Sequence, residues 1–98
     1  MPIKGSPRLD LIMRIGANSA YSLRECPLAG KQTVTDDLEN PGGSILRAEV
    51  PNTVELRQWV RSLGPNAEVL EPTFLRQEMA EEVATLAWRY GFLPKPSL

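Results

Sequence analysis

Two segments of this 98-residue chain alternate apolar and polar side chains with the period of a β-strand, and this pattern constrains the fold more than any other feature. Side chains along a strand point to the two faces of a sheet in turn, so a period of two places every second residue in the core. The first segment ends at Gly16, and the second follows the pair Gly42–Gly43, which is typical of a turn. We therefore predict two strands with one buried face each, over Leu9–Ile15 and Ser44–Val50.

Five further segments complete the predicted fold. Asn52 and Glu55 have the spacing of a capping box, which predicts the start of a helix, and Gly64–Pro65 predicts its end. The apolar side chains of this helix recur at helical spacing and are expected in the core; they are Leu56, Trp59, Val60 and Leu63. The other predicted elements are a helix over Ala17–Cys26, a polar edge strand over Lys31–Asp36, a short strand over Ala67–Leu70 and a long helix over Thr73–Tyr90.

The long last helix carries one apolar stripe that we expect to be buried. Its members are Leu75, Met79, Val83, Leu86 and Tyr90. The glutamates at positions 78, 81 and 82 are expected to face water. Trp88 and Phe92 lie off the stripe near the end of the helix, which makes them candidates for an interface with a partner.

The predicted order of elements is β-α-β-β-α-β with one additional helix at the C-terminus. This is the α+β, ferredoxin-like arrangement, in which helices cover one face of an antiparallel sheet and the first and third strands are central neighbours. We expect residues 1–7 to be a linker or a cloning remnant, residues 8–92 to form the domain and residues 93–98 to be a flexible tail.

The composition argues against acid–base catalysis by histidine, metal binding and internal disulfide bonds. The chain has no histidine and one cysteine, so it lacks the commonest general base and metal ligand and cannot form an internal disulfide. We expect no enzyme activity, no metal and no cofactor. Its net charge of −1 argues against a primary DNA-binding domain. Without an apolar run of about 20 residues or a signal peptide, the chain is expected to be cytoplasmic and not bound to membranes.

Arginines of the alternating segments are the candidates for binding a ligand. If the first and third strands are neighbours, strand alternation places Arg14 and Arg47 together on the sheet face opposite the helices. Guanidinium groups match the oxygens of phosphate, so these two residues, with Arg8 as a weaker third, are predicted to contact a nucleic-acid effector.

The same sheet face carries Ile12 and Ile45, which we predict to be packing residues of an interface. Asp10 and Glu49 share this face as well. The alternative interpretation of the arginines is therefore a set of cross-strand ion pairs. Arg57 and Arg61, four residues apart on the second helix, form a small positive strip that we expect to be solvated.

The second half of the chain carries a set of spacings that resembles a known family. The run is Glu55-Leu56 and Trp59, then Leu63-Gly64, then Glu68-Val69-Leu70-Glu71-Pro72, then Leu75-Arg76 and a long helix that ends in Tyr90. It is similar to the C-terminal extension, or WCX module, of WYL-domain bacterial transcriptional regulators.

The resemblance implies a parent protein in which a winged helix-turn-helix domain and a WYL domain precede this module. It further implies that the module supports homodimerisation and helps the regulator sense a nucleic-acid effector, including single-stranded DNA. The alternative from another class is a stand-alone ferredoxin-like domain that binds a small metabolite.

Overall fold

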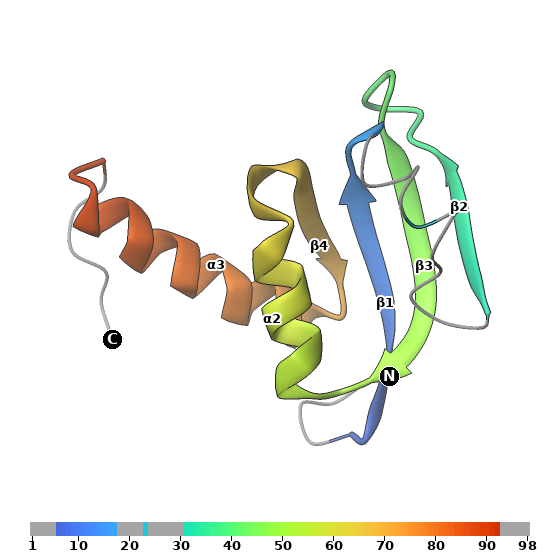
Figure 1. Ribbon diagram of the computed structural model, residues 1–98, viewed down its shortest axis with the longest axis horizontal. Helices are drawn as coiled ribbons and strands as arrows, with labels where there is room; N and C mark the ends of the chain where they lie inside the picture. The colour runs from blue at the N-terminus through green and yellow to red at the C-terminus, as the bar shows by residue number, and fades with distance from the viewer. Residues whose placement is uncertain (1–5, 18–22, 24–30, 93–98) are drawn as a thin grey trace.

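The two alternating segments form the central strands of an antiparallel sheet, as the sequence predicts (Figure 1). The structure is a computed structural model and describes residues 6–17, 23 and 31–92. Strand β1 spans Arg8–Ile15 and strand β3 spans Ser44–Pro51. Leu11 lies opposite Ala48 in their register, and both side chains are buried.

Two edge strands complete a four-stranded sheet with the order β2-β3-β1-β4. Strand β2 spans Gln32–Asp36 and pairs with β3, whereas β4 spans Ala67–Glu71 and pairs with β1. All three pairings are antiparallel, and the register of the last one shifts between Ile12 and Met13. The predicted central position of the first and third strands is confirmed. The strand order is consistent with a ferredoxin-like sheet.

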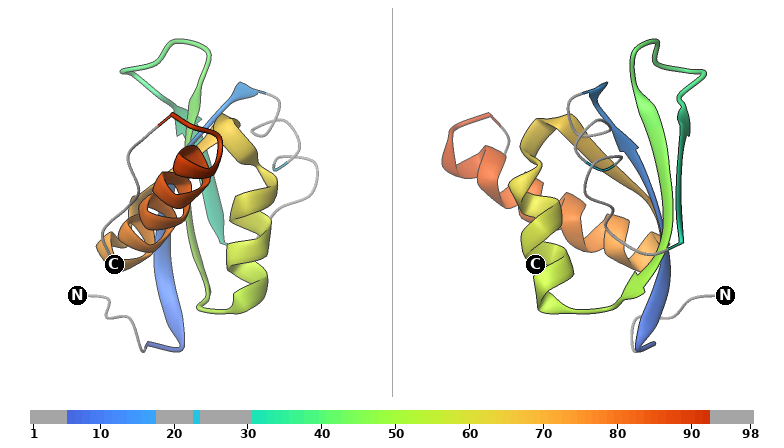
Figure 2. Two further views of the ribbon diagram at one scale, coloured as in Figure 1. Left: turned by 90° about the vertical axis from the view of Figure 1, so that its left-hand side faces the viewer. Right: turned by 45° about the vertical axis from the view of Figure 1, so that its right-hand side comes forward.

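The helix expected over Ala17–Cys26 lies outside the described residues, apart from Ala17 and Leu23. The predicted tail over residues 93–98 and residues 1–5 of the predicted linker lie outside them as well. Within the described residues, two α-helices and the sheet form an α+β fold, and Figure 2 shows both helices on the same side of the sheet. The expectation that the described helices share one face is confirmed.

Helix α2 spans Val54–Ser62, and its first turn corrects the predicted cap. The N-cap is Thr53, whose hydroxyl accepts a hydrogen bond of 3.1 Å from the backbone N–H of Leu56. Asn52 instead donates from its side chain to the carbonyl of Ser6. The predicted end is confirmed: Gly64 has a φ of +59°, in the left-handed region that ends many helices, and a 3-10 turn, η1, follows over Gly64–Asn66.

Helix α3 spans Thr73–Arg89 and contacts the core only through its beginning. Leu75 is fully buried and Met79 is half-buried, but Val83, Leu86 and Tyr90 are 63%, 53% and 75% exposed. The prediction of a continuous buried stripe is therefore wrong in its second half. Figure 1 shows the reason: α3 leaves the body of the domain and projects beyond the sheet.

The core lies between the sheet and the two helices. Trp59 and Leu63, predicted as core residues, are half-buried at its edge, whereas Leu56 and Val60 are buried as expected. The apolar side chains of the core come from β1, β3, β4, both helices and Leu23; they are Leu9, Leu11, Met13, Ile15, Leu23, Leu46, Ala48, Val50, Leu56, Val60, Val69 and Leu75. The opposite face of the sheet has no helix of the described chain on it.

Candidate functional site

The structure places the four main predicted site residues together on the face of the sheet opposite α2 and α3, which we call the open face. Ile12 lies opposite Arg47, and Arg14 lies opposite Ile45, in the β1–β3 register. None of these four side chains is buried, whereas their strand neighbours fill the core. The predicted shared face is therefore confirmed, although their binding roles remain predictions.

Arg14 is surrounded by three carboxylates, two from the loop between β2 and β3 and one from β4. Its Nε atom lies 3.0 Å from Oδ2 of Asp37, and its Nη1 atom lies 3.7 Å from Oε1 of Glu68 on β4. Its Nη2 atom also forms an ion pair with Glu39, in the loop between β2 and β3. An external phosphate would have to compete with these three internal anions. Of the cross-strand ion pairs of the alternative interpretation, Arg14 forms only the one with Glu68, which lies opposite it on β4; its other two partners belong to the β2–β3 loop.

The buried carboxylate of Asp37, beside Arg14, is stabilised by hydrogen bonds within the β2–β3 loop. Burial alone would raise the pKa of Asp37, but hydrogen bonds from the side chain of Asn40 and the backbone N–H of Glu39, with the charge of Arg14, hold it below its ordinary value. Its backbone N–H donates to the carbonyl of Gly43 over 3.0 Å. Asp37 therefore organises the β2–β3 loop, and Arg14 ties that loop to the centre of the sheet.

Glu68 is shared by two arginines. One of its oxygens lies 3.7 Å from Arg14, and the other accepts a hydrogen bond of 2.7 Å from Arg76 in the first turns of α3. Arg76 also donates to the backbone carbonyl of Val69. The open face and the base of α3 are connected through this one carboxylate.

The other two predicted arginines differ in how they are compensated. Arg8 pairs with Glu49 over 3.1 Å, one of the cross-strand ion pairs of the alternative interpretation, and both side chains are more than half exposed. Among the described residues, no carboxylate lies within 4.0 Å of the Arg47 guanidinium. Arg47 lines a shallow hollow of about 440 Å³ together with Lys31, Thr33 and Asp10. Of the three candidates, Arg47 is the one whose charge remains available to a ligand.

A pair of ion pairs between α2 and α3 was missed by the sequence interpretation. Arg57 pairs with Glu78, and Arg61 pairs with Glu82. The prediction that these side chains face water is wrong for Arg57 and Glu78, which are partly buried against each other. Arg61 and Glu82 are exposed as predicted, but they are paired with each other. The signal was present as equal spacing: four residues separate the arginines and four separate the glutamates.

The hydrogen bonds between Arg61 and Glu82 shift the pKa of both groups. The bonds from Arg61 hold the pKa of Glu82 below its ordinary value, against the opposing effect of burial. The same bonds raise the pKa of Arg61. The pair is therefore charged throughout the neutral range.

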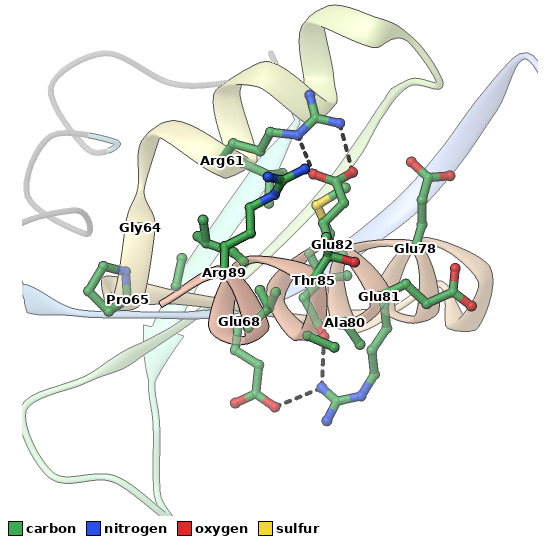
Figure 3. Close-up of a pocket in the computed structure, with 18 residues that line it drawn as sticks. Arg61, Gly64, Pro65, Glu68, Glu78, Ala80, Glu81, Glu82, Thr85 and Arg89 are labelled. Carbon is green, nitrogen blue, oxygen red and sulfur yellow. Dashed lines mark hydrogen bonds and ion pairs between the residues drawn. The ribbon is translucent and has the colours of Figure 1, made fainter. Parts of the chain in front are cut away.

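An apolar groove runs beside α3. It has a volume of about 1180 Å³, and its walls come from α3, the end of α2, η1 and β4 (Figure 3). Met79, Val83 and Leu86 line it on the side of α3, and Pro65 and Ala67 line it on the side of the body. The Arg61–Glu82 pair lies at its rim.

The predicted interface residues Trp88 and Phe92 lie at the projecting end of α3. Trp88 is 39% exposed and Phe92 is 84% exposed. Exposed aromatic groups are enriched at protein interfaces, so the location suits the predicted role. The role itself remains a prediction.

Two classes of feature are absent from the described part of the chain. No group of three or more acidic, cysteine or histidine side chains there could hold a metal ion. Neither α2 nor α3 is long and apolar enough to span a membrane.

Comparison with known proteins bears on the whole domain. A family model described as "WCX domain" matches residues 7–87, which is most of the chain. The match includes β1, the complete sheet and α3 up to two residues before its end. No curated protein matches the chain.

Proposed function

Since the chain belongs to the WCX domain family, we propose that it is the C-terminal regulatory and dimerisation module of a bacterial WYL-family transcriptional regulator. In the parent protein, a winged helix-turn-helix domain that binds DNA and a WYL domain precede it. The observation that carries the proposal is the projecting half of α3, where Val83, Leu86 and Tyr90 are exposed. Such a surface suits contact with a partner rather than chemistry.

The proposed domain is cytoplasmic, is not an enzyme and spans residues 8–92. Its proposed topology is ferredoxin-like; the helix predicted between β1 and β2, over Ala17–Cys26, lies mostly outside the described residues. The strand order β2-β3-β1-β4 supports this topology, because it places the first and third strands at the centre.

The proposed mechanism is a shift between arrangements of a homodimer. A nucleic-acid effector that binds one arrangement more tightly than another changes the spacing of the DNA-binding domains in the parent protein. Arg47 is our choice for phosphate contact within this module, because no described carboxylate lies within 4.0 Å of its guanidinium, although Asp10 and Glu49 line the same hollow. Arg14 and Arg8 are weaker candidates, since Asp37 and Glu49 respectively lie beside them.

The alternative function is a domain that binds a small metabolite. The observation that favours it is the hollow on the open face, which is lined by two carboxylates, Asp10 and Glu49, and by two cations, Lys31 and Arg47. This mixture of charges suits a zwitterion such as an amino acid better than a polyanion.

Two measurements on the isolated chain test the proposal. Sedimentation equilibrium should give a dimer at about 100 μM, since dimerisation by one surface is the commonest form of assembly. Thermal-shift assays should show a higher Tm with a single-stranded oligonucleotide and no change with a panel of amino acids. A monomer without an oligonucleotide response would reject the proposal, and a response to one amino acid alone would favour the alternative.

A further inference from the structure

The half of α3 that leaves the core is its apolar half. Residues 83–92 contain a single charged side chain, Arg89, whereas residues 73–82 contain four. A helix segment that faced only water would show the reverse distribution, with polar side chains around it. The exposed half therefore has the composition of a covered surface.

The spacing of the apolar side chains along α3 from Met79 to Tyr90 is the same whether it is read from the N-terminal or the C-terminal end. Met79, Val83, Leu86 and Tyr90 are separated by four, three and four residues. If two α3 helices lie antiparallel, with a two-fold axis passing between positions 84 and 85, Val83 of each copy meets Leu86 of the other. Met79 then meets Tyr90. A two-fold interface requires this kind of self-complementary pattern.

The groove beside α3 provides room for a second helix. Met79, Val83 and Leu86 are among its lining residues on α3, and its other wall is formed by the end of α2, η1 and β4. Its volume of about 1180 Å³ is large compared with one aromatic side chain. Tyr90 of a second copy would enter the groove at its inner end, next to Met79.

Charges on the flank of the stripe are also complementary. Glu78, Glu82 and Arg89 lie on one side of α3, at intervals of four and seven residues, and all three line the groove. In an antiparallel two-fold pair, this flank meets the same flank of the other helix. Arg89 of one copy then lies between Glu78 and Glu82 of the other, as a second cation beside carboxylates that already pair with Arg57 and Arg61 of their own chain.

We propose that α3 pairs antiparallel with α3 of a second copy of this chain, through Met79, Val83, Leu86 and Tyr90. This inference rests on the proposed function, because it names the surface through which the module dimerises. It selects the final helix over the open face of the sheet, where Ile12 and Ile45 were the other candidates.

Cysteine trapping tests the direction of the pairing. The variants Met79→Cys and Tyr90→Cys are made in a Cys26→Ser background, with a size tag on one of them. In the antiparallel pair, position 79 of one copy is next to position 90 of the other, so a disulfide should form when the two variants are mixed. Neither variant alone should form one, because equal positions are eleven residues apart along the helices, about 16 Å, and beyond the reach of a disulfide.

A matched pair of valine variants tests the surface itself. Val83 and Val54 are 63% and 64% exposed, and each lies on a helix, but only Val83 belongs to the stripe. Val83→Glu should raise the dimer dissociation constant by at least about tenfold, as expected for a central interface residue. Val54→Glu should leave it unchanged. Circular dichroism of both variants verifies that they are folded.

The outcomes separate the inference from the proposed function. Cross-links only in the mixture, together with a dimer sensitive to Val83→Glu, support the antiparallel pair. If Val83→Glu leaves the dimer dissociation constant unchanged, or if cross-links form between equal positions, the inference is overturned. The chain would then dimerise through another surface. A wild-type chain that remains a monomer overturns both the pairing and the dimerisation part of the proposed function.

Discussion

Arg61 and Glu82 join α2 to α3 through two parallel hydrogen bonds. The Nε atom of Arg61 lies 2.6 Å from Oε1 of Glu82, and its Nη2 atom lies 2.8 Å from Oε2. Arg57 and Glu78 repeat the pairing one helical turn earlier. Such two-bond pairs constrain orientation as well as distance. They hold the first half of α3 beside α2 and so set the direction in which the second half projects.

The first prediction is a pH dependence of stability that Glu82→Gln reduces. The folded pKa of Glu82 is lowered from its ordinary value of 4.5, so its contribution to stability is present above that pH and is lost as the pH falls through the lower, folded value. Asp37 acts in the same direction from 3.8, so the variant should keep part of the dependence. Urea midpoints from about pH 6 to about pH 3 measure this effect. Parallel curves for the variant and the wild type would contradict it.

The second prediction compares two apolar residues that the sequence places equally in the core. Leu75 is fully buried where α3 meets the core, so Leu75→Ala should lower the free energy of unfolding by about 3 kcal/mol. Trp59 is half-buried, so Trp59→Ala should cost about 2 kcal/mol, below the range for a fully buried indole. Chemical denaturation measures both values. A larger loss for Trp59→Ala than for Leu75→Ala would show that the packing is described wrongly.

The third prediction concerns the start of α2. Thr53→Ala removes the hydroxyl that caps the backbone N–H of Leu56 and should cost about 1 kcal/mol of stability. Thr53→Ser keeps the hydroxyl and serves as the control, with a much smaller loss. Equal losses in the two variants would mean that the cap hydrogen bond contributes nothing.

The fourth prediction ranks the arginines of the open face. Arg47→Gln should weaken binding of a single-stranded oligonucleotide several-fold, by about the contribution of one phosphate contact. Arg8→Gln should have less effect, because Glu49 already neutralises Arg8. Fluorescence anisotropy at a series of salt concentrations measures both, and a lower salt dependence is expected for Arg47→Gln. The reverse ranking would favour Arg8 as the phosphate ligand.

The sheet could be predicted from the sequence because its signal is local. The alternation in β1 and β3 fixes which side chains are buried, and it was enough to place Arg14, Arg47, Ile12 and Ile45 on one face. The cap of α2 was placed one residue too early, since Asn52 and Thr53 are both common at that position. Only the geometry shows which side chain reaches the N–H of Leu56.

The contacts of the charged residues could not be predicted in the same way. Arg14 meets Asp37, Glu39 and Glu68, which are far from it in the sequence and come together only when the strands pair. The sequence also does not show that Val83 and Leu86 are exposed. A stripe at helical spacing indicates that a helix has an apolar side, but it does not say whether the same chain or a partner covers that side.

The two carboxylate oxygens of Glu68 contact arginines on different elements, Arg14 on β1 and Arg76 on α3, and this links the free energies of the two contacts. One oxygen faces Arg14 on the open face, and the other holds Arg76 at the base of α3. A molecule that bound the open face and drew Arg14 away would leave Glu68 to Arg76 alone, and so would change the free energy that anchors the helix. Linkage makes the effect mutual: a change in the position of α3 must alter the affinity of the open face by the same factor. The two surfaces of this small domain are therefore coupled through a single carboxylate.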